Sequence, residues 1–255
     1  MQQTIKLKGR SSPEKRRPSM FWLFGPIVNN IWRLFTKYRI TPGSKLPATG
    51  PFIVASNHFS EVDPLVVAVG VYRLGRLPRF MAKASLFRVP VLGWVLRSTG
   101  QIAVERNRGQ RNSSNPIAAA QQLIANQSGI IIYPEGTLTR DPSLWPMRGK
   151  SGAIRIALEH KIPLYPMAHW GAQQIKGRYS KGLSLFPRKQ LSLAVGDPLD
   201  LSEFEGKELT QQVLADATDK LMAEITRLVA KLRGEKAPET RWDPAATGQA
   251  ETGRF

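Results

Sequence analysis

Cysteine is absent from this 255-residue chain, and its absence removes several kinds of chemistry. Without thiols there is no disulfide framework, no thiolate nucleophile and no cysteine-based zinc site. Histidine is scarce too, with three residues, and no close cluster of carboxylates accompanies them. We therefore expect neither a metal ion nor another cofactor, and catalysis has to use histidine, carboxylates, hydroxyls or lysine.

Long hydrophobic runs are also missing. No segment reaches the roughly 18 apolar residues of a membrane-spanning helix, because Arg33, Arg39, Arg88 and Arg97 interrupt the longest apolar windows. The first apolar stretch, 20–28, follows a basic arm and lacks the small-residue cleavage site of a secretory signal. We expect a peripheral or monotopic protein on the cytoplasmic face of the cell membrane.

Acidic residues are few compared with basic ones. The chain has 19 Asp and Glu against 37 Lys and Arg, a formal net charge of +18. This excess indicates an anionic partner, and by itself it does not distinguish nucleic acid, a membrane surface or a phosphorylated small molecule. Hydrophobic residues make up 42% of the chain, enough for a core in one large domain or two small ones.

The N-terminal part divides into two segments of different character. Residues 1–19 are rich in Lys and Arg, with Glu14 and two prolines, and are predicted to form a flexible basic arm. Residues 20–40 place apolar and aromatic side chains at spacings of three and four, which predicts an amphipathic helix. This pattern fits packing on the core as well as lying in a membrane interface. The basic arm favours the membrane, because each basic residue near an anionic leaflet contributes about 1 kcal/mol.

Residues 41–234 alternate short apolar runs with helical periodicity. This predicts an α/β domain with a mostly parallel central sheet flanked by helices. The expected strands are 51–56, 79–82, 101–104, 129–133, 163–168 and 190–195. The expected helices are 64–72, 86–98, 115–126, 152–160 and 209–233. Residues 235–255 are polar and contain Pro and Gly, so we expect a disordered tail there.

His58 is the histidine in the most reactive context. It follows the apolar strand 51–56, and open α/β sheets place their sites at the carboxyl ends of strands. Asp63 comes next to Pro64, a good position for the start of a helix. A turn between them would bring the carboxylate against the imidazole. Asp63 would then fix the tautomer, and the other ring nitrogen would take a proton from a substrate hydroxyl.

Four ordered blocks in the sequence together carry a family resemblance. The first is the segment from Asn57 to Asp63. The second combines the stretches from Lys83 to Gly93 and from Gly100 to Arg106. The third is Tyr133-Pro134-Glu135-Gly136-Thr137, and the fourth is Ile162-Pro163-Leu164-Tyr165-Pro166. In this order and at these distances they resemble the glycerol-3-phosphate and 1-acylglycerol-3-phosphate acyltransferase family of phospholipid synthesis. The resemblance covers roughly residues 45–200.

The resemblance implies roles for particular residues. His58 and Asp63 match the N-H-x-x-x-x-D motif, as general base and orienting acid. The positions implied to bind the phosphorylated acceptor are Arg106, Glu135, Gly136 and Thr137. The family often has an arginine directly after P-E-G-T, whereas this chain has Leu138 there and a displaced Arg140.

The implied reaction moves a fatty acyl chain from a thioester, acyl-CoA or acyl carrier protein, to 1-acylglycerol 3-phosphate, giving phosphatidic acid. Glycerol 3-phosphate or another lysophospholipid is the alternative acceptor. The chemistry needs a base, a donor for the developing oxyanion and cations for phosphate, and it needs no covalent enzyme intermediate. The candidate phosphate-binding cations are Lys83, Arg106, Arg140 and Lys150.

Two other classes of function are less well supported. A serine hydrolase using Ser60 or Ser151 would need the G-x-S-x-G elbow, which does not occur in the chain. A nucleic-acid-binding module would interleave basic residues with aromatic stacking platforms, whereas the aromatic residues here gather in 21–35. The expected partners are therefore the acyl donor, the phosphorylated acceptor and an anionic membrane surface, without nucleic acid.

Overall fold

The computed structural model describes residues 20–104 and 116–250. The predicted basic arm, Arg106 and the last five residues of the chain lie outside the described residues. Within the described ranges, no helix is both long enough and apolar enough to cross a bilayer.

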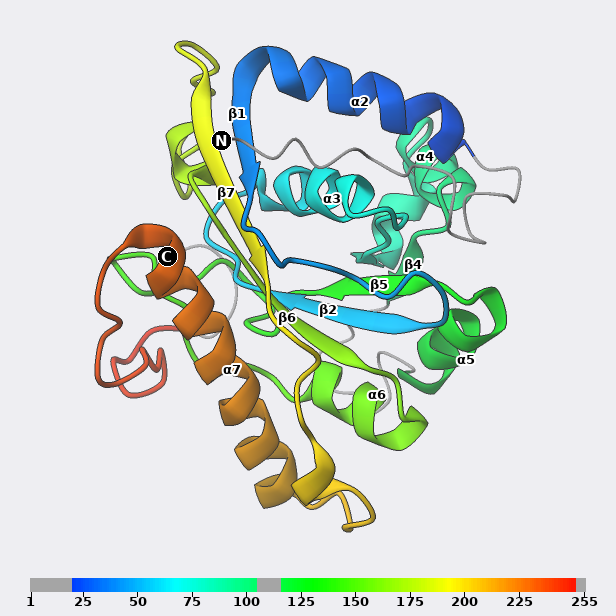
Figure 1. The fold of residues 1–255 in the computed structure, drawn as a ribbon, viewed down its shortest axis with the longest axis vertical. Helices are drawn as coiled ribbons and strands as arrows, with labels where there is room; N and C mark the ends of the chain where they lie inside the picture. Colours follow the sequence, from blue (N-terminus) through cyan, green and yellow to red (C-terminus); the bar gives the residue numbers. More distant parts are fainter. Residues whose placement is uncertain (1–19, 105–115, 251–255) are drawn as a thin grey trace.

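A five-stranded sheet runs through the centre of the molecule, in the order β1-β7-β6-β2-β5 (Figure 1). Its strands are β1 Thr36–Ile40, β2 Phe52–Ser56, β5 Gly129–Ile132, β6 Leu164–Trp170 and β7 Lys189–Val195. All pairings are parallel except that of β6 with β7. A second, two-stranded parallel sheet pairs β3 Met81–Lys83 with β4 Ile102–Val104, and a bridge from Phe80 to Ile131 joins it to β5. The predicted mostly parallel α/β architecture is confirmed.

Helices cover both faces of the central sheet, as Figure 1 shows. On one side lie α2 Phe21–Phe35 and α3 Asp63–Arg73, and on the other α5 Pro116–Asn126, α6 Gly152–His160 and α7 Gln211–Arg233. The short elements are α4 Leu92–Ser98 and the 3-10 turns η1 Ala84–Arg88, η2 Ala172–Gln174 and η3 Ser202–Phe204.

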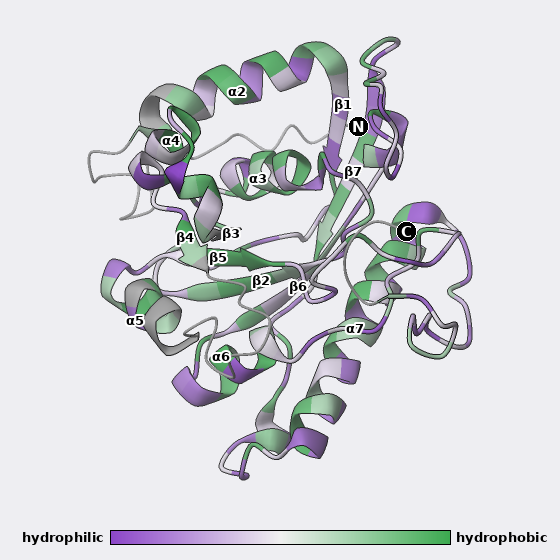
Figure 2. Ribbon diagram, turned by 180° about the vertical axis from the view of Figure 1, so that it is seen from behind, coloured by the Kyte–Doolittle hydropathy of each residue, from purple (hydrophilic) through white to green (hydrophobic). Residues whose placement is uncertain are grey.

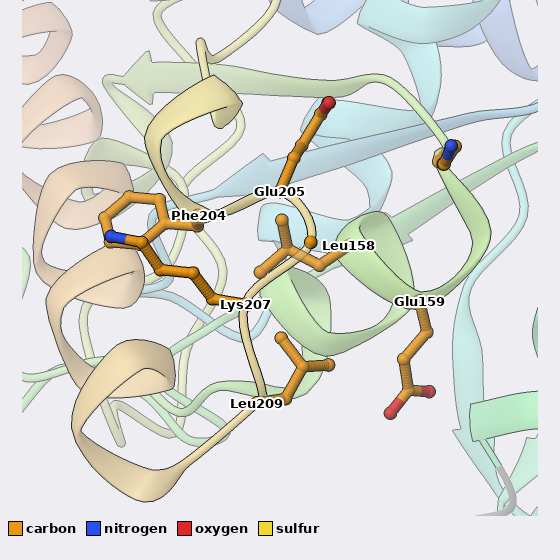
Figure 3. Close-up of a pocket in the computed structure, with 8 residues that line it drawn as sticks. Leu158, Glu159, Phe204, Glu205, Lys207 and Leu209 are labelled. Atoms are coloured by element: carbon orange, nitrogen blue, oxygen red, sulfur yellow. The ribbon is translucent and has the colours of Figure 1, made fainter.

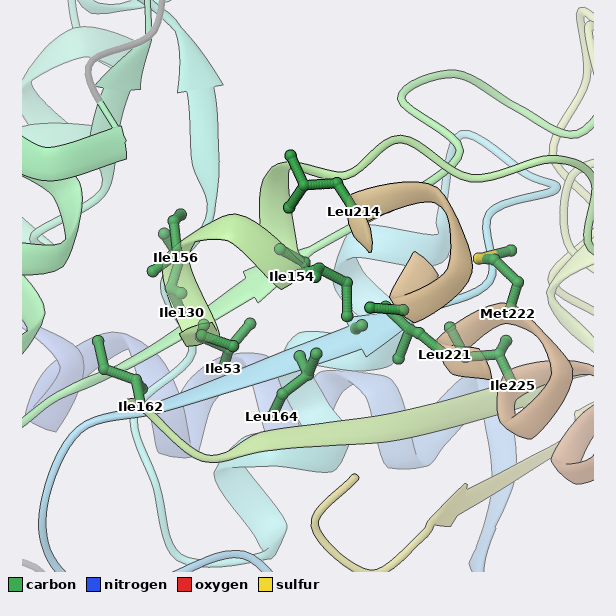
Figure 4. Close-up of a cluster of buried hydrophobic side chains, with 14 of the residues drawn as sticks. Ile53, Ile130, Ile154, Ile156, Ile162, Leu164, Leu214, Leu221, Met222 and Ile225 are labelled. Carbon is green, nitrogen blue, oxygen red and sulfur yellow. The ribbon is translucent and has the colours of Figure 1, made fainter. Parts of the chain in front are cut away.

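The interior strand β2, between β6 and β5, is buried along its whole length because helices pack on both of its faces. Ile53 belongs to the cluster formed with α6 and α7, which Figure 4 shows, whereas Phe52 and Val54 pack with residues of α3. A strand covered on both sides reads as a continuous apolar run in place of an alternating one. This arrangement places the carboxyl end of β2 in the middle of the molecule, where the site residues begin.

The segment 20–40 differs from the predicted single helix. The helix α2 ends at Phe35, because Thr36 turns into extended backbone with φ −135° and ψ 147°. Residues Thr36–Ile40 then form the edge strand β1, paired in parallel with β7. The expected helix 86–98 is likewise divided, since Val91 has a φ of 61° between η1 and α4.

The expectation of a disordered tail does not account for the contacts of residues 235–250. The carbonyl of Trp242 accepts a hydrogen bond from the backbone of Arg148 at 3.0 Å. Arg241 forms an ion pair with Asp219 of α7 at 2.7 Å. This segment therefore packs beside α7 and the loop around residue 148.

Candidate functional site

The candidate site forms where β2 and β5 end side by side. These strands are parallel neighbours in register from Phe52 with Gly129 to Ala55 with Ile132, so the loops that follow them emerge at the same edge of the sheet. One loop carries His58 and leads into α3, and the other carries the P-E-G-T turn. The topology thus joins two blocks that are far apart in the sequence.

The predicted contact between His58 and Asp63 is present. Nδ1 of His58 lies 3.0 Å from Oδ2 of Asp63, which is fully buried at the start of α3. The same oxygen accepts hydrogen bonds from the backbone N–H groups of Phe59 at 2.6 Å and Ser60 at 2.7 Å. These three donors fix the position of the carboxylate. The hydrogen bonds from the amides of Phe59 and Ser60 to Asp63 also stabilise the tight turn between His58 and Asp63.

The imidazole of His58 is held so that one nitrogen is free to act as a base. Its ring stacks on Tyr133 with centroids 4.2 Å apart, and 18% of the side chain is exposed. A carboxylate accepts the proton of Nδ1, so Nε2 carries the lone pair. This arrangement can take a proton from a hydroxyl and return it to a leaving group.

Glu135 has a different position from the expected contact with the acceptor. Its side chain is buried, with Oε1 accepting from the backbone N–H of His58 at 2.9 Å and Oε2 from that of Met147 at 3.1 Å. In addition, the backbone N–H of Thr139 donates to the carbonyl of His58 at 2.7 Å. Glu135 therefore ties the two loops of the site together through their backbones.

Burial sets the protonation of this carboxyl. Desolvation raises the pKa of Glu135 to about 8, although the hydrogen bonds from Met147 and His58 act in the opposite direction. Burial also raises the pKa of the neighbouring Tyr133 hydroxyl well above its usual range. Both shifts favour the uncharged form of these two side chains.

Of the remaining predicted binding residues, the structure describes the side chains of some but not of all. Gly136 has a φ of +69°, and the side chain of Lys150 lies against it: its Nζ is 3.4 Å from where a Cβ would be. Thr137 is half-buried in the same turn. Arg140 is fully buried, so in this structure it does not present its charge at the surface. The side chain of Lys83, like Arg106, lies outside what the structure describes.

His169 is a site residue that the sequence did not assign. It lies on β6 with its side chain fully buried, and its Nε2 is 3.7 Å from Oδ1 of Asp63. One signal was available, since a histidine interrupts the apolar strand Leu164–Trp170, whose other side chains pack on the core. The expected strand 163–168 stopped one residue short of it.

A depression of about 250 Å³ lies elsewhere on the molecule, between the end of α6 and the loop after η3 (Figure 3). Leu158, Phe204 and Leu209 are among the residues that line it. Because α6 leads back to the amino end of β6, this depression lies at the opposite edge of the sheet from His58. Among the residues that the structure describes, no group of three or more His, Asp or Glu side chains could hold a metal ion.

The fold and the site define a class of protein. It is an α/β protein whose buried aspartate orients a histidine at a strand end, a geometry suited to group transfer by general base catalysis. The acyltransferase family model matches residues 37–170, more than half of the chain. The chain therefore belongs to the acyltransferase family, as its ordered blocks predicted.

Individual relatives agree with this membership. A 1-acyl-sn-glycerol-3-phosphate acyltransferase of Bacillus subtilis is 31% identical over 190 residues, covering 73% of this chain and 85% of the relative. One of Streptococcus pneumoniae is 23% identical, over 87% of this chain and 78% of the relative. The crystal structure of the 1-acyl-sn-glycerophosphate acyltransferase PlsC from Thermotoga maritima shares the fold, with a TM-score of 0.61 and 19% identity over 84% of this chain and 81% of that chain.

We predict that His58→Ala lowers the rate of acyl transfer by about 10²–10⁴-fold, because it removes the base and leaves the fold in place. Asp63→Asn should be badly impaired as well, since an amide does not stabilise the imidazolium as a carboxylate does. Turnover of a thioester donor measures both effects. His160→Ala, which removes the histidine at the end of α6, is the matched control and should retain activity. Near-normal turnover by a folded His58→Ala variant would contradict the assignment.

Glu135 should make the stability of the protein depend on pH. Its pKa is about 8 in the folded protein against an ordinary value of 4.5, so the unfolded chain releases the proton first. The resulting stabilisation is complete below about pH 4.5 and is lost as the pH rises through about 8. Glu135→Gln does not titrate and loses one of two acceptors, so it should be less stable by about 1–3 kcal/mol at pH 5.

Urea unfolding of both proteins at pH 5, 7 and 9 checks this prediction. The stability difference between wild type and Glu135→Gln should become smaller as the pH rises, because only the wild type loses the contribution of the buried carboxyl. All other titrating groups are shared by the two proteins and cancel in the difference. A difference that stays constant across this range would show that the carboxyl of Glu135 is already ionised at pH 5.

Proposed function

We propose that this protein transfers a fatty acyl chain from an acyl thioester to the free hydroxyl of 1-acylglycerol 3-phosphate, forming phosphatidic acid. The observation that carries the proposal is the contact of His58 with the buried Asp63, beside the turn that holds Glu135 and Gly136. The activity named for the similar proteins of Bacillus subtilis and Streptococcus pneumoniae supports the choice of acceptor. Glycerol 3-phosphate or another lysophospholipid is the alternative.

The reaction proceeds in two proton transfers through one nitrogen. Nε2 of His58 takes the proton of the acceptor hydroxyl as the hydroxyl oxygen attacks the thioester carbonyl, and Asp63 stabilises the imidazolium. The tetrahedral intermediate then collapses, the carbon–sulfur bond breaks, and the departing thiolate receives the proton from Nε2. An ester and a free thiol result, without a covalent bond to the enzyme.

The donor and the phosphate contacts complete the proposal. Acyl-CoA is the expected donor, with acyl carrier protein as the alternative. Arg106 is proposed to bind the acceptor phosphate, and Lys150 is a second cation because its side chain lies against Gly136 in the P-E-G-T turn. Lys83, Thr137 and Arg140 remain candidate contacts. Glu135 acts through the backbone of the site and not on the acceptor.

The acceptor is tested by supplying acyl-CoA or acyl carrier protein thioester with either 1-acylglycerol 3-phosphate or glycerol 3-phosphate, and measuring the lipid formed. We expect phosphatidic acid from the acyl-CoA and monoacyl pair, and formation slower by about 10²–10⁴-fold with His58→Ala. Arg106→Ala should weaken use of the phosphorylated acceptor while changing slow hydrolysis of acyl-CoA much less, because water carries no phosphate. Equal loss of both activities would instead assign Arg106 to the fold or the donor.

The N-terminal helix α2 is proposed to rest on the membrane surface. Its outward side is apolar: Ile27, Val28, Ile31 and Leu34 are exposed, whereas Trp32 on the other side is buried in the core. A second exposed apolar group lies on α4 and on the link from η1 to α4, with Val89, Val91, Leu92 and Trp94 among its members. Figures 1 and 2 place α2 and α4 at the same end of the molecule, and Figure 2 shows hydrophobic residues along α2.

Such a surface suits a bilayer because burying its side chains removes apolar area from water. The net charge of +18 adds attraction to anionic lipid. The protein would then act as a peripheral or monotopic enzyme on the cytoplasmic face of the membrane, where its lipid acceptor resides.

Substituting Ile31 and Leu34 with glutamine should reduce sedimentation with anionic liposomes and turnover of the lipid acceptor, because it removes apolar contacts without touching the core. Ile31 is 49% and Leu34 64% exposed, and Ile124→Gln on α5, at 40%, is the matched control on the other side of the sheet. A deletion up to Thr41 is not a clean test, since it removes β1 from the sheet. Undiminished sedimentation of the double variant would place the anchor elsewhere, on α4 or in the basic arm.

A further inference from the structure

His169 is a buried imidazole that the reaction above does not use. Its Nε2 lies 3.2 Å from the carbonyl oxygen of Asn57. A carbonyl oxygen only accepts hydrogen bonds, so Nε2 carries the proton. Burial lowers the pKa of His169 below its usual value, which leaves the ring neutral at pH 7 with Nε2–H as a fixed donor.

The same N–H faces the second oxygen of Asp63. All three short hydrogen bonds to this carboxylate go to Oδ2, whereas Oδ1 is buried and has no hydrogen-bond partner among the described residues. Nε2 of His169 is 3.7 Å from Oδ1, longer than a hydrogen bond. In a buried site of low dielectric constant, an N–H dipole at this distance still acts on the charge of a carboxylate. His58 and His169 thus flank Asp63 on its two oxygens.

The register of the sheet fixes His169 in this place. The ladder between β2 and β6 ends with Ser56 opposite Met167, and Asn57 continues it with its side chain. Oδ1 of Asn57 accepts from the backbone N–H of His169 at 3.0 Å, and its Nδ2 donates to the carbonyl of His169 at 3.1 Å. These two bonds use the backbone of residue 169, so they remain when its side chain is changed.

From this geometry we infer that His169 is a positioning residue: its Nε2–H holds the Asn57 carbonyl and the Oδ1 side of Asp63, so that Oδ2 stays directed at His58. The inference rests on the proposed role of His58 as general base. His169 itself touches no substrate. The other titratable side chains that interact electrostatically with Asp63 are Tyr133 and Glu135 on the β5 side. Both are acids, neutral or anionic, so neither supplies a positive charge to the carboxylate.

Two substitutions separate the effect of the Nε2–H donor of His169 from the effect of how its ring packs. His169→Phe keeps an aromatic ring against Phe59, whose centroid lies 4.8 Å from that of His169, and removes the N–H. His169→Gln keeps a neutral N–H donor and loses the ring. Two readouts apply to each variant: kcat and KM for acyl transfer, and the NMR signal of the Nδ1–H proton that His58 shares with Asp63, which requires no substrate.

We expect His169→Phe to lower kcat by about tenfold or more with KM little changed, since the Asn57 carbonyl loses its buried donor and Asp63 loses the N–H dipole beside its Oδ1. Its Nδ1–H signal should broaden or disappear through exchange with water. His169→Gln should retain the signal and most of the rate. Glutamine fills the space of the imidazole less well than phenylalanine does. A higher rate in His169→Gln than in His169→Phe would therefore show that the N–H donor matters and not the volume of the ring.

Two results would overturn the inference. One is a His169→Phe variant with wild-type kcat and an unchanged Nδ1–H signal. The other is equal impairment of both variants with that signal intact in each, which would show that only the volume of the ring matters. If the signal responds as expected but the wild-type protein acylates no lysophospholipid, the proposed reaction is wrong while the role of His169 in holding the pair stands.

Discussion

A single oxygen atom, Oδ2 of Asp63, fixes the conformation of the loop that carries His58. It gathers the ring N–H of His58 and two consecutive backbone N–H groups within 3.0 Å. The carboxylate therefore orients the imidazole of His58 and also stabilises the turn that carries this residue. The rest of the site is built around this loop, because Glu135 and Thr139 bind the backbone of His58 from the neighbouring loop.

Hydrogen bonds from side chains to backbone groups hold much of this site together. Both carboxyl oxygens of Glu135 accept hydrogen bonds from backbone N–H groups. Both polar atoms of the Asn57 side chain bind the backbone of His169. Two polar residues that sit in sequence motifs thus bind other loops and strands of the protein. Buried polar side chains that are fully paired in this way make a rigid site, because leaving any one of them without its partner is costly.

The parts of the fold that depend on local pattern were predictable. Every expected strand is present, and α3, α5, α6 and α7 begin within two residues of their expected positions. The His58–Asp63 pair was predictable because both residues belong to one short turn. By contrast, β1 was missed since its partner β7 lies about 150 residues later and the alternation in Thr36–Ile40 is too short to stand out. The contact of His169 with Asp63 was not predicted, because only the register of β6 against β2 brings the two residues together. The contacts of Glu135 were not predicted either, because its partners are backbone amides, which have no sequence signature.

The direct passage from α2 into β1 has a mechanical consequence. Helix α2 ends at Phe35 and β1 begins at Thr36, with no loop between them, and the hydroxyl of Thr36 binds back to the carbonyl of Trp32 at 2.7 Å. Because β1 is hydrogen-bonded along its length to β7, the axis of the helix cannot swing without bending the sheet. A helix attached in this way has a fixed orientation relative to the sheet, unlike a helix joined by a flexible linker. If α2 rests on a bilayer as proposed, the fold itself would set the tilt of the whole sheet relative to the membrane, and with it the direction from which a lipid would approach His58.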